Sequence, residues 1–327
     1  MEKKLLLTIV GQTATGKTGL ALKLAERLIK KGFKKVLLLS ADSKQVFQGL
    51  EILTGADVPA DFQQMKNDRF LYPYFQKANR SIELHGVACV TGEEEWSVAH
   101  FQKLFNILWQ TVDEKTALIV VGGTGLYHQQ IFNPATTVNI KPDQQLRKKL
   151  ALKSLTQLQT KLKQAWTARW EKMNHSDRNN PRRLIRAIEL ASAKLPIKSL
   201  TTKSLTAKNP IVQIGLQLPV KTLQAKIIQR VEDRLEQGVM AQVKQFEFHH
   251  PTPILQAKAS LGYQEINQYL NGKLALEKLR ENWALAELKY AKRQQTWWRK
   301  QAQIDWFKAD QDNLEEKVWE IITPRLK

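Results

Sequence analysis

The sequence predicts an α/β fold, in which a P-loop NTPase-like parallel sheet core carries a helical insertion domain. Three observations support this prediction. An apolar run ends in a phosphate-binding loop, apolar strands alternate with amphipathic helices, and a basic helical block then interrupts the alternation. We therefore expect residues 1–138 to form the first part of the core, residues 139–208 a basic insertion, and residues 209–327 the rest of the core with C-terminal helices.

The composition sets broad limits. The 327 residues, 43% of them hydrophobic, are enough for a packed core. The chain has no run of 18 apolar residues, and its charged start leads straight into a predicted strand, so we expect no membrane span, no signal peptide and a cytoplasmic location. The single cysteine, Cys89, excludes internal disulfides and a zinc site of several thiolates. We expect Cys89 to be buried.

The charge is strongly positive and unevenly distributed. The 51 Lys and Arg residues against 31 Asp and Glu residues give a net charge of +20, which suggests a polyanionic partner. Between Lys141 and Pro210 there are 17 Lys or Arg residues and 4 Asp or Glu residues. A surplus that served only solubility would be spread more evenly. The insertion is therefore the predicted nucleic-acid-binding region.

The phosphate-binding loop, GQTATGKT, follows the apolar run LLLTIV directly. Gly11 and Gly16 allow the backbone to turn its N–H groups toward an anion, and the helix expected to start near Lys17 adds its positive end. Lys17 would neutralise the outer phosphate, and the Thr18 hydroxyl would bind Mg²⁺. The loop indicates a diphosphate or a triphosphate and does not distinguish them. Its residues are Gly11, Gln12, Thr13, Ala14, Thr15, Gly16, Lys17 and Thr18.

A second strand, Val36 to Ser40, leads into the polar residues Asp42, Ser43, Lys44 and Gln45. The carboxyl ends of strands line the ligand crevice in open α/β sheets, so this group should lie beside the phosphate loop. Asp42 would then organise Mg²⁺ or act as a catalytic base. Helix capping is the alternative, because strand-to-helix junctions often use such residues.

Residues 55–92 have an irregular pattern with several aromatic residues, which predicts a loop-rich crossover. His85, within it, is expected to be structural. Apolar residues at helical spacing follow over 97–112 and predict a helix that packs on the sheet.

The apolar strand Ala117 to Val121 ends in the sequence GGTGLY. Glycines at a strand's carboxyl end permit close approach by a ligand, and Thr124 places a hydroxyl there. An ordinary P-loop NTPase usually has an acidic residue at such a strand end for its magnesium ion. This sequence therefore argues against ATP hydrolysis.

The basic block is helical in pattern, and Pro181 predicts the start of a helix on which Arg182, Arg183 and Arg186 lie on or near one face. Such arginines can bind phosphates. The serine- and threonine-rich residues 198–210 suggest a linker. Strand alternation then resumes at Ile211 to Leu216.

The C-terminal part begins with a predicted helix from Lys221 to Phe248, on which Lys226, Arg230 and Arg234 recur every four residues. Further helices, a short strand near Ile304 to Phe307 and a last helix follow. Near the end of one helix, basic residues alternate with two tryptophans, which could either stack on nucleic acid or face the core. These residues are Lys292, Arg293, Trp297, Trp298, Arg299 and Lys300.

Seven motifs occur in order along the chain: GQTATGKT, ADSKQVFQGLEI, VVGGTGLY, NPRRLIRAIEL, the Arg230 to Val243 helix with its Gln237-Gly238, LGYQEINQYLNG and AKRQQTWWRK. In this order and spacing the chain resembles the bacterial tRNA dimethylallyltransferases, also called tRNA isopentenyltransferases, over nearly its whole length. The resemblance implies transfer of a dimethylallyl group from dimethylallyl diphosphate to N6 of the adenosine 3′ of the anticodon in tRNA. Mg²⁺ and the anticodon stem-loop are the expected cofactor and partner, and we expect a monomer.

By position, the resemblance implies that the loop up to Thr18 binds the diphosphate, that Asp42 meets the adenine amine and that Thr124 supports it. Lys17 would contribute to catalysis. Lys221 stands where the family usually has an arginine that contacts pyrophosphate. A lysine keeps the positive charge but lacks the guanidinium's paired, fork-like N–H donors. LTGADVP after Ile52 and Asn180 before Pro181 also depart from the family pattern. The residues implied to contact tRNA are Asp42, Ser43, Lys44, Gln45, Thr124, Arg147, Arg182, Arg183, Leu184, Ile185 and Arg186.

Two other functions fit parts of the sequence. A P-loop nucleoside or nucleotide kinase would use the same loop for ATP and arginines of the insertion as a lid, although its lid should be more compact. An RNA-binding protein with a vestigial nucleotide site would not need Lys17, Thr18 and Asp42 together.

Overall fold

The computed structural model describes residues 4–66, 70–193, 211–301 and 303–326. The chain forms two compact units, Met1–Phe132 with Leu205–Lys327, and Asn133–Ser204. The linker predicted at 198–210 lies outside the described residues. Within the described ranges, every helix is too short or too polar to cross a membrane.

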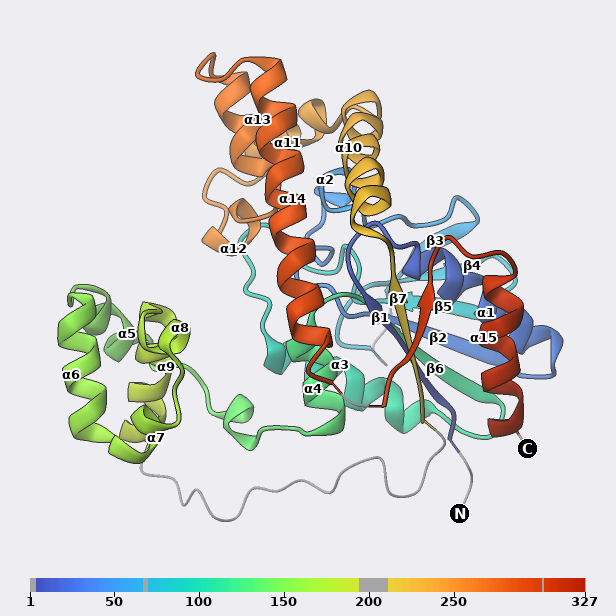
Figure 1. Cartoon of the computed structure of the whole chain (residues 1–327), viewed down its shortest axis with the longest axis horizontal. Coiled ribbons are helices and arrows are strands. Elements are labelled where there is room, and N and C mark those ends of the chain that lie inside the picture. Colours follow the sequence, from blue (N-terminus) through green and yellow to red (C-terminus); the bar gives the residue numbers. More distant parts are fainter. Residues whose placement is uncertain (1–3, 67–69, 194–210, 302, 327) are drawn as a thin grey trace. The chain divides into compact units, whose positions relative to one another are not determined.

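The first unit contains an eight-stranded sheet in the order β3-β4-β5-β2-β6-β1-β7-β8 (Figure 1). The pairings from β5 to β8 are all parallel. The mostly parallel sheet confirms the predicted α/β class. The parallel strands are β1 (Leu6–Gly11), β2 (Lys35–Ser40), β5 (Ile82–His85), β6 (Thr116–Val121), β7 (Ile211–Gln217) and β8 (Asp305–Lys308).

Residues 55–92, predicted to be a loop-rich crossover, instead add strands to one sheet edge. β3 (Phe62–Met65) and β4 (Tyr74–Lys77) are antiparallel to their neighbours, and β4 pairs with β5. Four-residue strands give too short an alternation to detect in the sequence, and sheet pairing makes them strands. His85 is structural, as expected: it is buried, its Nε2 lies 3.1 Å from Glu83 Oε2, and its ring stacks on Tyr74.

Alternate residues of the central strands pack on opposite faces of the sheet. On β1, Leu7 and Ile9 share a core with α1 (Lys17–Lys30) and α15 (Leu314–Ile322), whereas Leu6 belongs to the core with α3 (Val98–Thr111). This follows from the two-residue period of a strand. Figure 1 shows α1 and α15 together at one side of the sheet. Cys89 is buried, as expected, and burial raises the pKa of its thiol to about 12.

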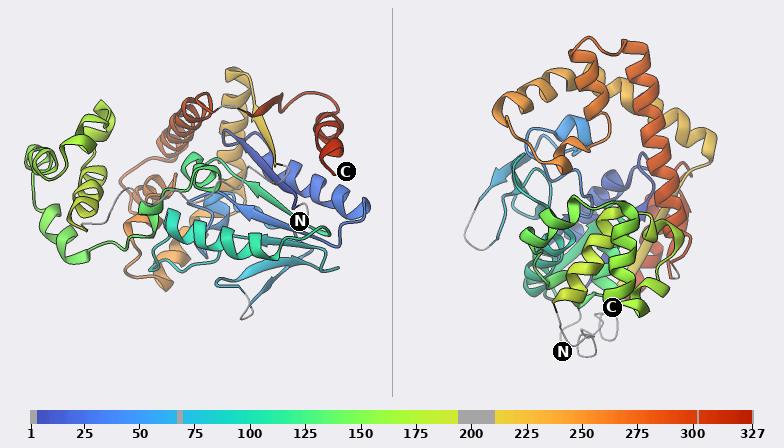
Figure 2. Two further views of the ribbon diagram at one scale, coloured as in Figure 1. Left: turned by 90° about the horizontal axis from the view of Figure 1, so that it is seen from below. Right: turned by 90° about the vertical axis from the view of Figure 1, so that its left-hand side faces the viewer.

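The helices of residues 220–298 gather at one end of the sheet in Figures 1 and 2. The single helix predicted for 221–248 is wrong, because Gly238, with φ of 87°, takes a left-handed conformation that separates two helices. A buried ion pair joins two of these helices, with Arg234 Nη1 2.9 Å from Glu287 Oε1. The helices are α10 (Val220–Glu236), α11 (Val239–His249), α12 (Leu255–Lys258), α13 (Tyr263–Leu270) and α14 (Leu276–Trp298), with α2 (Glu51–Thr54) and α4 (Gly125–Phe132) earlier in the chain.

The second unit is helical. Leu150, Leu158, Leu162, Leu184 and Ile188 lie in its small core. Pro181 begins a helix, as predicted, and the Asn180 side chain caps that helix by accepting the Arg183 N–H at 3.2 Å. Its elements are η1 (Thr136–Asn139), α5 (Gln144–Ala151), α6 (Leu155–Ala165), α7 (Thr167–Glu171), α8 (His175–Arg178) and α9 (Pro181–Ser192).

Candidate active site

The phosphate loop lies between β1 and α1 and has the backbone conformation of an anion cradle. Gly11 has φ of 135°, and an added Cβ there would come 2.2 Å from the Leu216 carbonyl oxygen, so only glycine lets β1 end beside β7. Ala14 and Gly16 are also left-handed, with φ of 59° and 78°. Such alternation turns successive N–H groups inward, where they can bind phosphate oxygens.

Lys17 opens α1 and reaches back over the loop, where its Nζ donates to the Gln12 carbonyl oxygen. Burial and the charge of Arg230 together lower the pKa of Lys17 to about 8, against the opposing effect of the Asp42 charge. The lysine therefore lies close to a second cation and to the predicted catalytic carboxylate. A bound diphosphate would favour its charged form.

Arg230 is a residue of this site that we did not predict. It projects from α10, and its Nη1 donates a 2.8 Å hydrogen bond to Thr13 Oγ1 in the loop. The backbone of Gly55 leaves it room, because an added Cβ there would lie 1.9 Å from Arg230 Nη2. The spacing of Lys226, Arg230 and Arg234 is visible in the sequence, but it does not indicate which of them faces the loop.

The segment after β2 sits beside the end of β6. Asp42 Oδ1 accepts the Lys44 N–H at 2.8 Å, which fixes a local turn, and the Ser43 N–H donates to Thr124 Oγ1 at 3.3 Å. Lys44 Nζ donates to the Gln256 carbonyl oxygen at 2.7 Å, and Gln45 links the Ser40 hydroxyl to the Gly55 carbonyl oxygen. The three predicted catalytic residues, Lys17, Asp42 and Thr124, thus belong to adjoining loops at the carboxyl ends of β1, β2 and β6.

Helix α14 crosses these loops. The Thr13 N–H donates to Gln294 Oε1 at 2.8 Å, and Gln12 Nε2 lies 3.5 Å from the Ala291 carbonyl oxygen. Tyr290, one turn earlier, hydrogen-bonds with Thr124 and Gln294, and burial together with the charge of Asp42 raises the pKa of its phenol. The motif AKRQQTWWRK contains Gln294, but its pattern does not reveal these contacts.

The two tryptophans at the end of α14 differ in exposure, so one faces the core and the other does not. Trp298 is 3% exposed and makes an edge contact with His128, whereas Trp297 is 36% exposed and packs against Gly125, beside Thr124. One tryptophan is therefore a core residue and the other borders the site.

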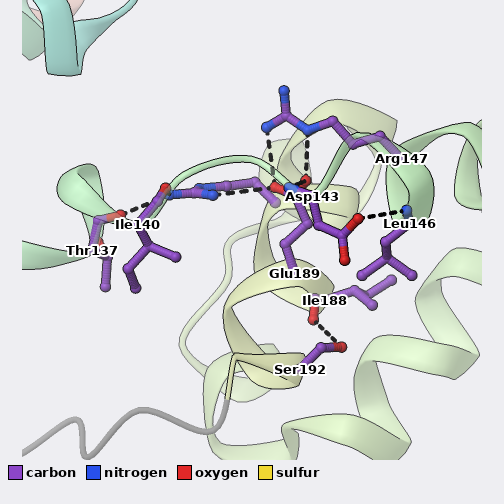
Figure 3. A network of polar contacts seen from close by, with 9 residues as sticks. Thr137, Ile140, Asp143, Leu146, Arg147, Ile188, Glu189 and Ser192 are labelled. Atoms are coloured by element: carbon purple, nitrogen blue, oxygen red, sulfur yellow. Dashed lines mark hydrogen bonds and ion pairs between the residues drawn. The ribbon is translucent and has the colours of Figure 1, made fainter.

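In the second unit, two of the arginines predicted to contact RNA bind a buried carboxylate (Figure 3). Arg147 donates to Glu189 from Nε at 2.6 Å and from Nη2 at 3.0 Å. Arg186 donates to Glu189 at 3.2 Å and to the carbonyl oxygens of Thr137 and Ile140 at 2.7 and 2.8 Å. These contacts tie α5 and the segment after η1 to α9.

The other residues of this predicted set differ in exposure. Arg183 is paired with Asp177, and Leu184 is buried in the helical core. Ile185 is partly buried against the same core. Arg182 is exposed and its guanidinium has no hydrogen bond or ion pair with the described residues. It is therefore the member of the set whose charge is most available to a ligand.

A family model described as IPP transferase matches residues 74–301. A tRNA dimethylallyltransferase of Trichormus variabilis is 33% identical over 320 residues, covering 97% of this chain and 98% of the relative. The chain belongs to the IPP transferase family. Many further tRNA dimethylallyltransferases match it, including one from Anoxybacillus flavithermus at 30% identity that covers 97% of this chain and 94% of the relative.

Solved structures agree with this family assignment. The tRNA isopentenylpyrophosphate transferase from Bacillus halodurans has a TM-score of 0.65 at 28% identity, and the match covers 99% of this chain and 97% of that one. A eukaryotic dimethylallyltransferase acting on tRNA has a TM-score of 0.75 at 21% identity, with 98% and 80% covered, and shows a shared fold.

Lys221 lies exposed in the first turn of α10, nine residues before Arg230, which is roughly 13 Å along a helix. Its contact with pyrophosphate stays a prediction.

Thr18, in the first turn of α1, has a hydroxyl without a hydrogen-bond partner among the described residues.

The predicted magnesium site has few protein ligands. No group of three or more His, Cys, Asp or Glu residues in the described part of the chain could hold a metal ion. Mg²⁺ usually keeps several waters and takes one or two protein ligands together with phosphate oxygens. The unpartnered Thr18 hydroxyl beside Lys17 fits that mode of binding.

Proposed function

We propose that the protein transfers a dimethylallyl group from dimethylallyl diphosphate to N6 of the adenosine 3′ of the anticodon in tRNA. The observation that carries the proposal is the convergence of Lys17, Asp42 and Thr124 on adjoining loops around one phosphate cradle. The site has cations for a leaving diphosphate and a carboxylate for an incoming amine. The strand end that would carry an NTPase's acidic residue has Gly122, Gly123 and Thr124 instead.

The first task of the site is to stabilise the leaving group. As the allylic C–O bond breaks, its electron pair leaves with the diphosphate and positive charge spreads over the allyl group. Lys17, Arg230 and N–H groups of the loop other than that of Thr13, which donates to Gln294, would stabilise the growing negative charge. Such preorganised groups are usually the largest contribution to catalysis.

The second task is to present the amine. The adenine has to leave its stack for N6 to reach the allyl carbon. A C–N bond forms there and N6 loses a proton, which Asp42 would accept. The Asp42 carboxylate is held by the Lys44 N–H, and the neighbouring Ser43 N–H orients Thr124, so both side chains have fixed positions.

Mg²⁺ would be held by the Thr18 hydroxyl and by the diphosphate, with water filling the remaining positions. When bound, the ion supplies further positive charge to the leaving diphosphate. We propose the basic helical unit as the surface that binds the anticodon stem-loop, since 16 residues from Lys141 to Ser204 are Lys or Arg.

Parallel titrations with dimethylallyl diphosphate and with ATP, followed by incubation of each with tRNA, test this proposal. We expect binding of dimethylallyl diphosphate and incorporation of the prenyl group into tRNA. Phosphate transfer from ATP without prenyl incorporation would instead identify a kinase. RNA binding without any transfer would leave only a binding protein.

A further inference from the structure

Gln294 joins two loops of the site from near the C-terminal end of α14. On one side, its Oε1 accepts the Thr13 N–H of the phosphate loop at 2.8 Å. On the other side, its Nε2 lies against Gly123, where an added Cβ would approach it to 1.9 Å. The side chain is 5% exposed, so protein groups surround the amide.

A second residue of α14 extends the same bridge. Tyr290, one helical turn before Gln294, hydrogen-bonds with both Gln294 and Thr124. Gln294 and Tyr290 thus connect the loop after β1, which carries the diphosphate cradle, to the loop after β6, which carries Thr124. The Ser43 N–H then links Thr124 to the segment of Asp42.

We propose that Gln294 is a positioning residue that fixes the phosphate loop relative to the loop of Thr124. The proposal rests on the prenyl transfer described above. In that reaction the allyl carbon belongs to a donor held by one loop, and the attacking amine is oriented by the other. Gln294 touches neither reacting atom and acts through both loops.

The expected effect is on rate rather than on binding. Reacting atoms must approach to roughly 3–3.5 Å, and a misplacement of about 1 Å can cost on the order of 10²-fold in rate. The loop amides, Lys17 and Arg230 would still hold the diphosphate without Gln294. Loss of the bridge should therefore lower the rate constant of transfer and leave the affinities for donor and tRNA nearly unchanged.

Gln294→Met removes both amide contacts and keeps the length of the side chain. We expect single-turnover transfer at saturating donor and tRNA to fall about 10- to 100-fold, with dissociation constants for inorganic pyrophosphate and for tRNA within about three-fold of wild type. Gln295→Met is the matched control, because Gln295 is the next residue of α14 and its side chain has no hydrogen bond with the described residues. It should transfer at the wild-type rate.

Gly123→Ala tests the same bridge from the opposite side and leaves α14 unchanged. Gly123 does not have a positive φ, so alanine is strained there mainly by Gln294 Nε2, and its approach to the Gly11 carbonyl oxygen at 3.2 Å is a smaller restraint. Moving the Gln294 amide away would break its bond to Thr13. We expect a similar fall in rate for Gly123→Ala alone, and no further fall when it is added to Gln294→Ala.

Wild-type rates in Gln294→Met and Gly123→Ala would overturn the positioning role. Equal loss of pyrophosphate affinity and rate in both variants would overturn it as well, because it would show a structural effect on the cradle. Should Gln294→Met not fold, Gly123→Ala and its combination with Gln294→Ala decide the question. A wild-type enzyme without any transfer would be a different failure, that of the proposed function.

Discussion

Lys17 is surrounded by groups that disfavour its charge. Burial and the nearby Arg230 hold its pKa at about 8, below the ordinary value of 10.5, although Asp42 opposes this. Because the folded-state pKa lies below the unfolded one, the charged lysine lowers the free energy of unfolding at pH values under about 8, and this cost disappears as the pH rises toward 10.5. The phosphate loop thus contains positive charge that an anion would stabilise.

Binding of a diphosphate should therefore raise the pKa of Lys17. Above pH 8, Lys17 should take up a proton as the complex forms. Affinity should fall as the pH rises through this value, since binding needs the charged lysine. Calorimetric titration with inorganic pyrophosphate in metal-free buffers of different ionisation enthalpy measures the uptake. Lys17→Met should abolish the part due to the lysine, and Lys221→Met, at an exposed position, should keep it. Equal proton uptake by wild type and Lys17→Met would contradict this assignment.

Asp42→Asn separates proton transfer from positioning. The amide oxygen can still accept the Lys44 N–H, so the local turn should persist. The amide cannot accept a proton, and general acid–base contributions are typically on the order of 10²–10⁴-fold. We expect single-turnover transfer to fall by that order while tRNA affinity stays within a few-fold of wild type. Measuring the rate across a magnesium titration distinguishes a metal-organising role, for which excess Mg²⁺ would restore part of the activity.

The residues of the site that could be predicted are those fixed by local sequence. The spacing of Gly11, Gly16, Lys17 and Thr18 defines the loop, and the position of Asp42 after a strand defines its place at the sheet edge. Arg230 and Gln294 could not be found in this way, because they approach the loop from helices more than 200 residues later in the chain. Helical periodicity identifies a buried face but not the partner that it meets.

At the scale of elements, α9 shows that arginines on one helix can have different tasks. Arg182 is exposed, whereas Arg186 binds Glu189 and two carbonyl oxygens before α5. Glu189 is 4% exposed and accepts hydrogen bonds from Arg147, Arg186 and the Asp143 N–H. A buried carboxylate that loses a cation is costly, so Arg186 contributes to the stability of the helical unit itself.

Single substitutions should separate these tasks. Arg182→Ala should weaken tRNA binding and lower the slope of log affinity against log salt by about one, with an unchanged melting temperature. Arg186→Ala should lower the free energy of unfolding of the helical unit by about 1–3 kcal/mol, because Glu189 loses one cation but keeps Arg147 and the Asp143 N–H. Salt-dependent binding assays and thermal unfolding measure the two effects. An unchanged salt slope in Arg182→Ala would contradict this RNA surface and point to Lys292 to Lys300 instead.

Other elements depend on contacts that the sequence does not reveal. The strands β3 and β4 exist because each pairs with a neighbour in the sheet, not because their residues alternate strongly. Gly238 divides the predicted long helix into two, and this single glycine is the only sign of the break in the sequence. A single glycine inside a helical pattern can be tolerated or can end the helix, and tertiary packing decides between these outcomes.

At the scale of the whole molecule, long periodic segments were sufficient to predict the α/β core. The alternation of apolar strands and amphipathic helices predicted the parallel sheet, and the interruption by basic residues predicted a separate helical unit. We expected that unit over 139–208, and the compact unit spans Asn133–Ser204. Boundaries of this kind depend on packing between elements, which local propensity describes poorly.

The most direct test of the central claim uses two anticodon stem-loop RNAs that differ at one position. One has adenosine 3′ of the anticodon, and the other has guanosine there. Each is incubated with the protein, dimethylallyl diphosphate and Mg²⁺, and its nucleosides are analysed by mass spectrometry. We predict N6-dimethylallyl-adenosine from the first RNA and no prenylated nucleoside from the second. Prenylation of both RNAs, or of neither, would contradict the proposed transfer to that adenosine.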